Sequence, residues 1–253
     1  MTTATKLSTA FTPKAFIPYL VAGDPTSAAT VTHIKALVAG GADAIELGIP
    51  FSDPVADGPD IQAGDLRAFA AGISVADVFA IVAAAREFTA VPFIFVTYAN
   101  IPFKFGYDAF CARCAELNVA GLIIPDLPLE EQGEIRPSAS KYGISIIETM
   151  PLNSTPERIA ALTASPTEFV LLQGDPQAAN LPALTAQLRA AGQVRSIIGI
   201  PTVDATQATT LAANVDGVSI DAAIVSLIAQ QPETAPQKLT AAAKTLTAAV
   251  HSA

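Results

Sequence analysis

The sequence predicts an α/β protein of the (β/α)8 type, a TIM barrel formed by a single domain. Short apolar runs of β-like composition alternate with helical patterns along the whole chain, as parallel strands buried between helices do. The chain has 253 residues, of which 51% are hydrophobic, and this is enough for one sizeable core. Eight strand–helix units in a chain of this length are typical of the closed barrel.

Each expected strand is an apolar run followed by a turn-forming segment rich in Gly, Pro, Asp or Asn. The expected strands are Phe16–Val21, Ala44–Gly48, Phe93–Thr97, Gly121–Pro125, Ser145–Glu148, Phe169–Leu172, Ser196–Gly199 and Gly217–Ser219. The expected helices are Ala28–Ala39, Val75–Phe88, Tyr107–Leu117, Leu129–Tyr142, Pro156–Leu162, Leu181–Ala191, Asp204–Ala213, Ala222–Gln230 and Pro236–Val250.

No linker or low-complexity segment divides the chain, so we expect one domain over residues 1–253. Residues 1–14 are expected to form an N-terminal extension, and residues 236–250 a closing C-terminal helix. An open doubly wound sheet is the alternative. It usually has fewer strands at this length, and no Gly-x-Gly-x-x-Gly follows the first strand.

The charge balance argues against two classes of partner. The net charge is −9, and the 14 Lys and Arg residues form no basic run. Binding to nucleic acids or to anionic membrane surfaces needs clustered cations. The mean hydropathy is +0.44, but the longest apolar run, Val78–Ala85, is too short to span a bilayer. Residues 1–13 lack the apolar core of a signal peptide, so we expect a cytoplasmic protein.

Elimination leaves carboxylates as the acid–base groups. Cys111 and Cys114 lie inside a helical pattern and are expected to be packing residues, because structural zinc needs four ligands. His33 falls in the first predicted helix and His251 in the C-terminal tail, away from the strand ends where barrel active sites lie. No Gly-x-Ser-x-Gly is present. We therefore expect no metal site, and we assign any acid–base work to Asp or Glu.

The strongest candidate is Glu46, which stands inside an otherwise apolar strand. Burying a carboxylate is costly unless it is paired or used. Period 2 puts Ile45, Leu47 and Ile49 on the face that packs on helices, and Glu46 on the small face that points into the barrel. Burial there should raise the pKa of Glu46, which suits a group that gives and takes protons. The alternative is a structural carboxylate bonded to backbone N–H groups.

Further acids follow in the loop after this strand and near the end of the fifth strand. Asp57 belongs to an Ala-Asp-Gly-Pro turn signal, so a turn role stays open for it. Asp53 and Asp60 fit loop or capping roles. Glu148 is a further candidate acid, with a solvated or ion-paired residue as the alternative.

The segment Glu46-Leu-Gly-Ile-Pro-Phe-Ser-Asp-Pro-Val-Ala-Asp-Gly-Pro59 resembles the signature of the tryptophan synthase α subunit family. The resemblance is strong over residues 16–150 and extends to Ile17–Pro25, Arg67–Gly72, Tyr98–Asn100 and Pro125–Glu131. It implies a barrel lyase of tryptophan biosynthesis that cleaves indole-3-glycerol phosphate to indole and glyceraldehyde 3-phosphate. This is a retro-aldol reaction that needs no cofactor and no metal.

The resemblance also implies roles for individual residues. Glu46 matches the family acid–base group, and Asp57 matches the aspartate that stabilises positive charge on the indole nitrogen. The positions that match the family's indole pocket are Tyr19, Ile61, Val96, Ile123 and Thr149. The family works as an α2β2 complex with a pyridoxal-phosphate β subunit, and the matching contact positions are Pro50, Asp53 and Asn100.

The C-terminal half departs from the family pattern where the phosphate would bind. Gly199 matches a phosphate-contacting glycine, but the loop Gln173–Asn180 is short and lacks the family's Thr-Gly. The family Gly-Ser pair after the eighth strand is Asp221-Ala222 here. The aspartate is expected to cap the next helix and occupy N–H groups that a phosphate would use.

Two hypotheses follow from this departure. The first is a working lyase with an altered phosphate cradle. The second is a divergent paralogue with an impaired phosphate site, which acts as a regulatory partner of a β subunit or on a non-phosphorylated analogue.

Overall fold

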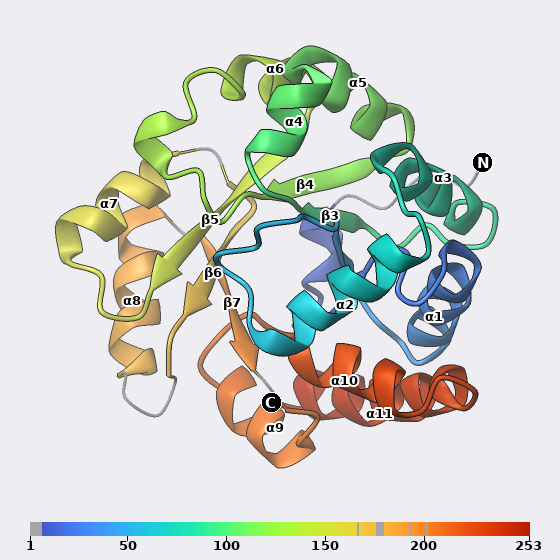
Figure 1. Cartoon of the computed structure of the whole chain (residues 1–253). Coiled ribbons are helices and arrows are strands. Elements are labelled where there is room, and N and C mark those ends of the chain that lie inside the picture. Colours follow the sequence, from blue (N-terminus) through green and yellow to red (C-terminus); the bar gives the residue numbers. More distant parts are fainter. Residues whose placement is uncertain (1–6, 166, 176–179, 193, 201) are drawn as a thin grey trace.

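A closed barrel of parallel strands forms the centre of the protein (Figure 1). The computed structural model describes residues 7–165, 167–175, 180–192, 194–200 and 202–253. Each strand pairs with the next, and β8 pairs with β1, so the open sheet is excluded and the predicted barrel is confirmed. The strands are β1 Ala15–Val21, β2 Ile45–Gly48, β3 Phe93–Val96, β4 Val119–Ile123, β5 Ser145–Pro151, β6 Phe169–Gln173, β7 Arg195–Ile200 and β8 Gly217–Ile220.

Helices surround the barrel, and α2 lies in front of the barrel end that faces the viewer in Figure 1. The α-helices are α1 Ser27–Ala39, α2 Pro59–Ala70, α3 Val75–Ala85, α4 Asn100–Phe105, α5 Tyr107–Glu116, α6 Arg136–Tyr142, α7 Pro156–Ala164, α8 Leu181–Gly192, α9 Ala205–Ala212, α10 Ala222–Gln230 and α11 Ala235–His251. Two 3-10 turns are η1 Leu7–Ala10 and η2 Leu129–Glu131.

Two helices were not expected from the sequence. The expected helices include none between the second strand and Val75, but α2 begins at Pro59, whose fixed φ suits a first helical position. Its buried face includes a glycine and an aspartate, Gly64 and Asp65, which weakens the apolar pattern that identifies a helix. Likewise Asn100 is the first residue of the short helix α4 instead of a loop residue.

The expected helix Leu129–Tyr142 is wrong in its first half. The structure has the 3-10 turn η2, then a break, and α6 starts only at Arg136. Pro137 explains the break, because proline lacks the N–H that an upstream helix would need and its ring clashes with the preceding turn. Pro137 is tolerated in the first turn of α6, because an N–H at this position would have no partner within the helix.

The expected N-terminal extension packs on the barrel from residue 7 onward. Leu7, Ala10 and Phe11 are buried in one cluster with Ile17 and other barrel-interior residues. The Phe11 ring meets the edge of the Phe169 ring with centroids 5.7 Å apart. This segment therefore covers the end of the barrel where the strands begin, and leaves the opposite end open for a site.

Within the described residues, no single helix is long and apolar enough to cross a membrane. The bent pair of α2 and α3, at 97° to each other, passes that test only when the two are counted together, by length and composition.

Candidate active site

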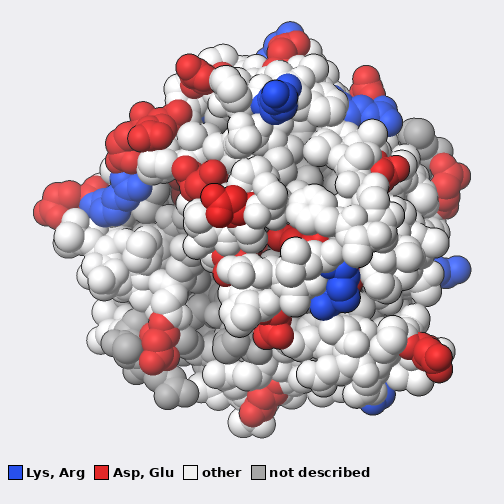
Figure 2. Space-filling view, in the orientation of Figure 1, with Lys and Arg blue, Asp and Glu red and all other residues white. Residues whose placement is uncertain are grey.

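A cavity of about 490 Å³ lies at the ends of the strands where barrel enzymes hold their substrates. Its lining comes from β2 and the loop after it, from the loop after β4, and from the ends of β6, β7 and β8. The lining residues are Glu46, Ala56, Pro125, Leu171, Leu172, Gln173, Gly174, Gly199, Ile200, Ser219 and Asp221. In Figure 2, acidic side chains lie around the centre of this face, and much of the remaining surface is uncharged.

Glu46 points into the barrel, as period 2 predicts. Its side chain is 3% exposed, and its Oε2 accepts a hydrogen bond of 2.9 Å from Ser219 Oγ. Its Oε1 is buried without a partner among the described residues. Burial raises the pKa of Glu46 to about 8, the Ser219 hydrogen bond opposes this rise, and the charge of Asp221 adds to it. Glu46 is therefore protonated at neutral pH, and the alternative of a carboxylate held by backbone N–H groups finds no support in its contacts.

Asp57 is held by a tyrosine that follows the end of β3. Tyr98 donates its hydroxyl to Asp57 Oδ2 at 2.8 Å, and the Tyr98 hydroxyl oxygen accepts the backbone N–H of Ala56 at 3.0 Å. The Tyr98 ring stacks on Phe51, with centroids 4.9 Å apart and planes 17° apart. Burial raises the pKa of Asp57, and the Tyr98 hydroxyl opposes that rise by favouring the ionised form. These contacts hold the Asp57 carboxyl group in place next to Ala56, which lines the cavity.

Three of the five predicted indole-pocket residues come together above the barrel interior. Tyr19 and Ile61 belong to one buried cluster, and Val96 packs against it. Tyr19 is paired with Glu46 across β1 and β2. Its hydroxyl occupies the space beside Gly48, where an added Cβ would lie 1.9 Å from the oxygen, so only glycine leaves room for this ring position.

Ile123 and Thr149 continue this apolar wall on the next strands. Ile123 is the register partner of Val96 and belongs to the buried interior of the barrel. Thr149 is half-buried and is the register partner of Leu171, which lines the cavity. Four of the predicted pocket positions therefore lie on β1, β3, β4 and β5, and Ile61 lies on α2. Thr149 is not part of the cluster around Tyr19.

The end of the cavity at β7 and β8 is polar and acidic. Gly199 and Asp221 both line it, and an atom added at the Cβ position of Gly199 would meet nothing within 4 Å. Asp221 is the N-cap of α10, and its Oδ1 accepts the N–H of Ala222, as the sequence predicts. Burial raises the pKa of Asp221, which the hydrogen bond from Ala222 opposes. Residues 176–179 of the loop after β6 lie outside the described residues.

The predicted partner-contact positions lie at the same end of the barrel but differ in exposure. Asp53 and Asn100 are exposed, whereas Pro50 is buried. Large apolar side chains are exposed beside them on the loop after β2, on α2 and on α4. They are Val55 at 76%, Leu66 at 70%, Phe69 at 40%, Phe103 at 60% and Phe105 at 41% exposure.

Several site residues were not identified as such from the sequence. Asp65 on α2 is 5% exposed, and burial raises its pKa to about 7 while a hydrogen bond with the Phe51 backbone opposes that rise. Asp24 is buried and makes two hydrogen bonds of 2.7 Å with Arg67, which join the loop after β1 to α2. Period 2 applied to β8 would have pointed Ser219 inward, because it alternates with the outward residues Val218 and Ile220.

The remaining acid candidates have structural partners. Glu148 pairs with Arg136 at 2.7 Å and accepts from Gln132 at 3.2 Å, so the ion-paired alternative applies to it. Asp60 lies in the first turn of α2 and accepts from Ser226 Oγ at 2.7 Å. Cys111 and Cys114 are buried and unbridged in α5, as expected. Among the described residues, no three His, Cys, Asp or Glu side chains are grouped so that they could hold a metal ion.

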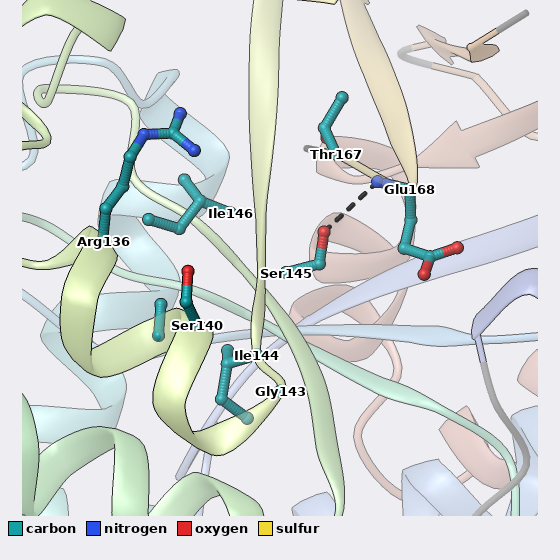
Figure 3. Close-up of a pocket in the computed structure, with 9 residues that line it drawn as sticks. Arg136, Ser140, Gly143, Ile144, Ser145, Ile146, Thr167 and Glu168 are labelled. Carbon is teal, nitrogen blue, oxygen red and sulfur yellow. Dashed lines mark hydrogen bonds between the residues drawn. The ribbon is translucent and has the colours of Figure 1, made fainter. Parts of the chain in front are cut away.

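A second hollow of about 400 Å³ lies at the other end of the barrel (Figure 3). Ser145 and Glu168, where β5 and β6 begin, line it and are joined by a 3.2 Å hydrogen bond from the Glu168 N–H to Ser145 Oγ. Its cation, Arg136, already binds Glu148 and Gln132. This hollow therefore offers no free cation for a ligand, and the cavity around Glu46 is the better candidate site.

The comparisons with known proteins agree with the fold. The family profile described as "Tryptophan synthase alpha chain" matches residues 7–251. The tryptophan synthase alpha chain of Lacticaseibacillus casei is 49% identical over 245 residues, covering 94% of this chain and 92% of the relative. That of Lactiplantibacillus plantarum is 46% identical and covers 88% of each chain.

Solved structures give the same result. A crystal structure of tryptophan synthase from M. tuberculosis contains a chain that superposes with a TM-score of 0.90 at 31% identity, over 98% of this chain and 99% of that one. Tryptophan synthase subunit alpha from Legionella pneumophila gives a TM-score of 0.88 at 30% identity, over 97% and 98% of the two chains. The chain belongs to the tryptophan synthase alpha chain family, a family of carbon–carbon lyases in tryptophan biosynthesis.

Proposed function

We propose that this chain cleaves indole-3-glycerol phosphate to indole and glyceraldehyde 3-phosphate, with Glu46 as the acid–base group and Asp57 as the fixed anion. The observation that carries the proposal is the contrast between these two carboxyl groups beside one cavity. Glu46 is buried and protonated at neutral pH, with one oxygen unpartnered among the described residues. Asp57 accepts a tyrosine hydroxyl that favours its ionised form. Such a pair divides proton transfer and charge stabilisation between two groups.

The proton balance of the reaction fits one carboxyl group acting twice. Glu46 first gives its proton to the ring carbon that carries the glycerol chain, and the positive charge that forms on the indole nitrogen lies against Asp57. The Glu46 carboxylate then takes the proton of the hydroxyl on the adjoining side-chain carbon. As this hydroxyl becomes a carbonyl, the bond between its carbon and the ring carbon breaks. The electron pair of that bond returns to the ring. Glu46 ends the cycle protonated, and no cofactor is needed.

The rest of the proposed site follows from the shape of the cavity. A flat indole needs apolar walls, and Tyr19, Ile61, Val96 and Ile123 supply them, with Thr149 at the margin. We place the phosphate at the β7–β8 end, beside Gly199, Asp221 and Ala222. The N-terminus of α10 is the local source of backbone donors there.

We also propose a β subunit as the partner, in an α2β2 complex. The support is the exposed apolar side chains Val55, Leu66, Phe69 and Phe103 around the mouth of the site, next to Asp53 and Asn100. An apolar surface of this kind marks an interaction site, and partner binding there would cover the loop that carries Asp57. Pro50 would act from beneath this surface, since it is buried.

A second candidate function is supported by Asp221. Its carboxyl group already binds the first N–H of α10, and it would lie close to a bound phosphate. Two like charges about 4 Å apart repel by about 1–4 kcal/mol, depending on solvation. This favours a paralogue that binds the phosphorylated substrate weakly and serves a β subunit, or that accepts a non-phosphorylated analogue.

Release of indole from indole-3-glycerol phosphate tests the proposal, with the purified chain alone and with a β subunit added. We expect turnover by the wild type and its loss in Glu46→Gln, because the amide cannot carry the proton although it keeps the size of the side chain. Circular dichroism should show both proteins folded. Substantial activity in Glu46→Gln would remove Glu46 from the acid–base role, and cleavage of only the non-phosphorylated analogue would favour the second function.

A further inference from the structure

We propose that Ser219 is the positioning residue of Glu46: it binds Oε2 and thereby reserves Oε1 as the oxygen that carries the proton to and from the substrate. The inference rests on the proposed function, since it assumes the acid–base role of Glu46. It concerns a residue on β8 that approaches Glu46 from across β1.

The first support is that Ser219 is a polar residue in an apolar layer. The interior cluster of the barrel consists of Ala, Ile, Leu, Val and Phe side chains such as Ile17, Ile94 and Ile197. Ser219 is the register partner of both Ile17 on β1 and Gly199 on β7. A hydroxyl group in such surroundings costs free energy unless it is bonded. Its bond is the one of 2.9 Å to Glu46, and both residues are 3% exposed.

The second support is the asymmetry of the two Glu46 oxygens. Oε2 has the Ser219 hydroxyl, whereas Oε1 is buried and has no partner among the described residues. A neutral carboxyl group carries its proton on one oxygen only. A donor on Oε2 therefore favours the acid form with the proton on Oε1. Glu46 and Ser219 both line the cavity, so this proton is held where substrate would enter.

Among the described residues, no charged or titratable group makes a second side-chain hydrogen bond to Glu46. The rise of the Glu46 pKa includes a contribution from Asp221 on the cavity wall. Tyr19 is another titratable group at this end of the barrel, and the charges of Asp57, Asp65, Asp221 and Glu46 act on it. Of these acids, Asp221 is the one whose charge raises the Glu46 pKa by repelling its carboxylate. Ser219 is the group that lowers the pKa of Glu46 and so offsets part of this repulsion.

The test compares Ser219→Ala with Ser219→Thr. Removing a hydrogen bond to a carboxylate costs about tenfold or more in the step that uses it, so kcat should fall about tenfold in Ser219→Ala. The reaction needs protonated Glu46, so activity is lost as pH rises through the Glu46 pKa. Without Ser219 that pKa rises, and the basic limb of kcat/KM should move up by about one pH unit. Thr keeps the hydroxyl and should restore both values, since the space beside the facing Gly199 is open.

Ser196→Ala is the matched control. Like Ser219, Ser196 is a buried serine that donates to a carboxylate, here Asp216 Oδ2 at 3.2 Å, but it lies near the start of β7. The substitution removes the same atoms far from the cavity, so any loss of stability should resemble that of Ser219→Ala while the pH profile stays that of the wild type.

A carboxyl-carbon NMR titration of Glu46 in the resting protein supplies a readout that needs no turnover. Its midpoint should lie higher in Ser219→Ala than in the wild type and in Ser219→Thr. An unchanged midpoint with an unchanged basic limb would overturn the positioning role, even if Glu46→Gln is inactive and the proposed function stands. If Glu46→Gln keeps its activity, the proposed function fails instead, and the NMR midpoint still decides whether Ser219 tunes this carboxyl group.

Discussion

Replacing Tyr98 by phenylalanine tests whether the Tyr98 hydrogen bond keeps Asp57 in place and favours its ionised form. The Tyr98 hydroxyl donates to Asp57 Oδ2 at 2.8 Å and accepts the Ala56 N–H at 3.0 Å. A hydrogen bond to a charged acceptor contributes about 1.5–3 kcal/mol, so we expect kcat/KM to fall by about 10- to 150-fold. Ala56 is exposed, so water can replace its lost acceptor and the loss of stability should be small.

The pH profile of the same variant gives a second, independent readout. Asp57 must be ionised to stabilise a cation, so activity is lost as pH falls through the Asp57 pKa. Tyr98 lowers that pKa, opposing the effect of burial. Without the hydroxyl the pKa rises, and the acidic limb of kcat/KM, followed by indole release, should move to higher pH.

Tyr142→Phe is the control for this experiment. It also removes a tyrosine–aspartate hydrogen bond, the 3.0 Å contact with Asp108, but that bond is exposed and joins α5 to α6. Its kinetics should match the wild type. If Tyr98→Phe keeps the wild-type kcat/KM and acidic limb, then Asp57 is not positioned by Tyr98, and the argument from this hydrogen bond is refuted.

Two further substitutions test the two ends of the cavity. Gly48→Ala places a Cβ 1.9 Å from the Tyr19 hydroxyl. It should lower the stability measured by thermal unfolding by about 1–3 kcal/mol and impair indole release. The control Gly133→Ala, whose added Cβ meets nothing within 4 Å, should do neither. The double change Asp221→Gly with Ala222→Ser removes the competing cap and should lower KM for indole-3-glycerol phosphate about fivefold or more, as removal of a repulsion of about 1–4 kcal/mol implies. A tight wild-type KM that the double change leaves unaltered would contradict this reading of Asp221.

The barrel was predictable because its strands are buried on both faces. Continuous apolar runs such as Phe93–Val96 and Phe169–Gln173 then stand out between polar turns, and alternation with helices leaves few other topologies. Helix α2 was missed for the opposite reason. Its buried face is made partly of Gly64 and Asp65, and the helix lies so close to β1 that a Cβ added at Gly64 would be 2.9 Å from Val21 Cγ2. Such a face is set by its tertiary neighbours and has no apolar signature in the sequence.

The site was predictable in part. Glu46 could be found from the sequence alone, because one acid in an apolar strand is costly and its direction follows from period 2. Its partner Ser219 could not be found in this way, since it lies 173 residues away and the contact depends on closure of the barrel through β1. The same holds for Tyr98 and Asp57, which are 41 residues apart on different strand ends.

Charge at the mouth of the barrel links the chemistry to the choice of substrate. The Tyr19 hydroxyl lies in the field of Glu46, Asp57, Asp65 and Asp221, and together with burial these raise its pKa well above the ordinary value. Arg67 is bonded to Asp24 and also interacts with the charge of Asp60. No lysine or arginine occurs between Arg195 and Lys238, so the ends of β7 and β8 carry no cation of their own.

In such a field a carboxyl group stays protonated more easily, which is what Glu46 needs to act first as an acid. The same field would repel a phosphate dianion at the proposed position, where Asp221 lines the cavity. In the proposed reaction, the acidity that keeps Glu46 protonated should therefore weaken the binding of a phosphorylated substrate, and we expect a single residue, Asp221, to contribute to both effects. For this reason Asp221→Gly should improve phosphate binding and at the same time lower the Glu46 pKa, so that tighter binding comes with a basic limb at lower pH.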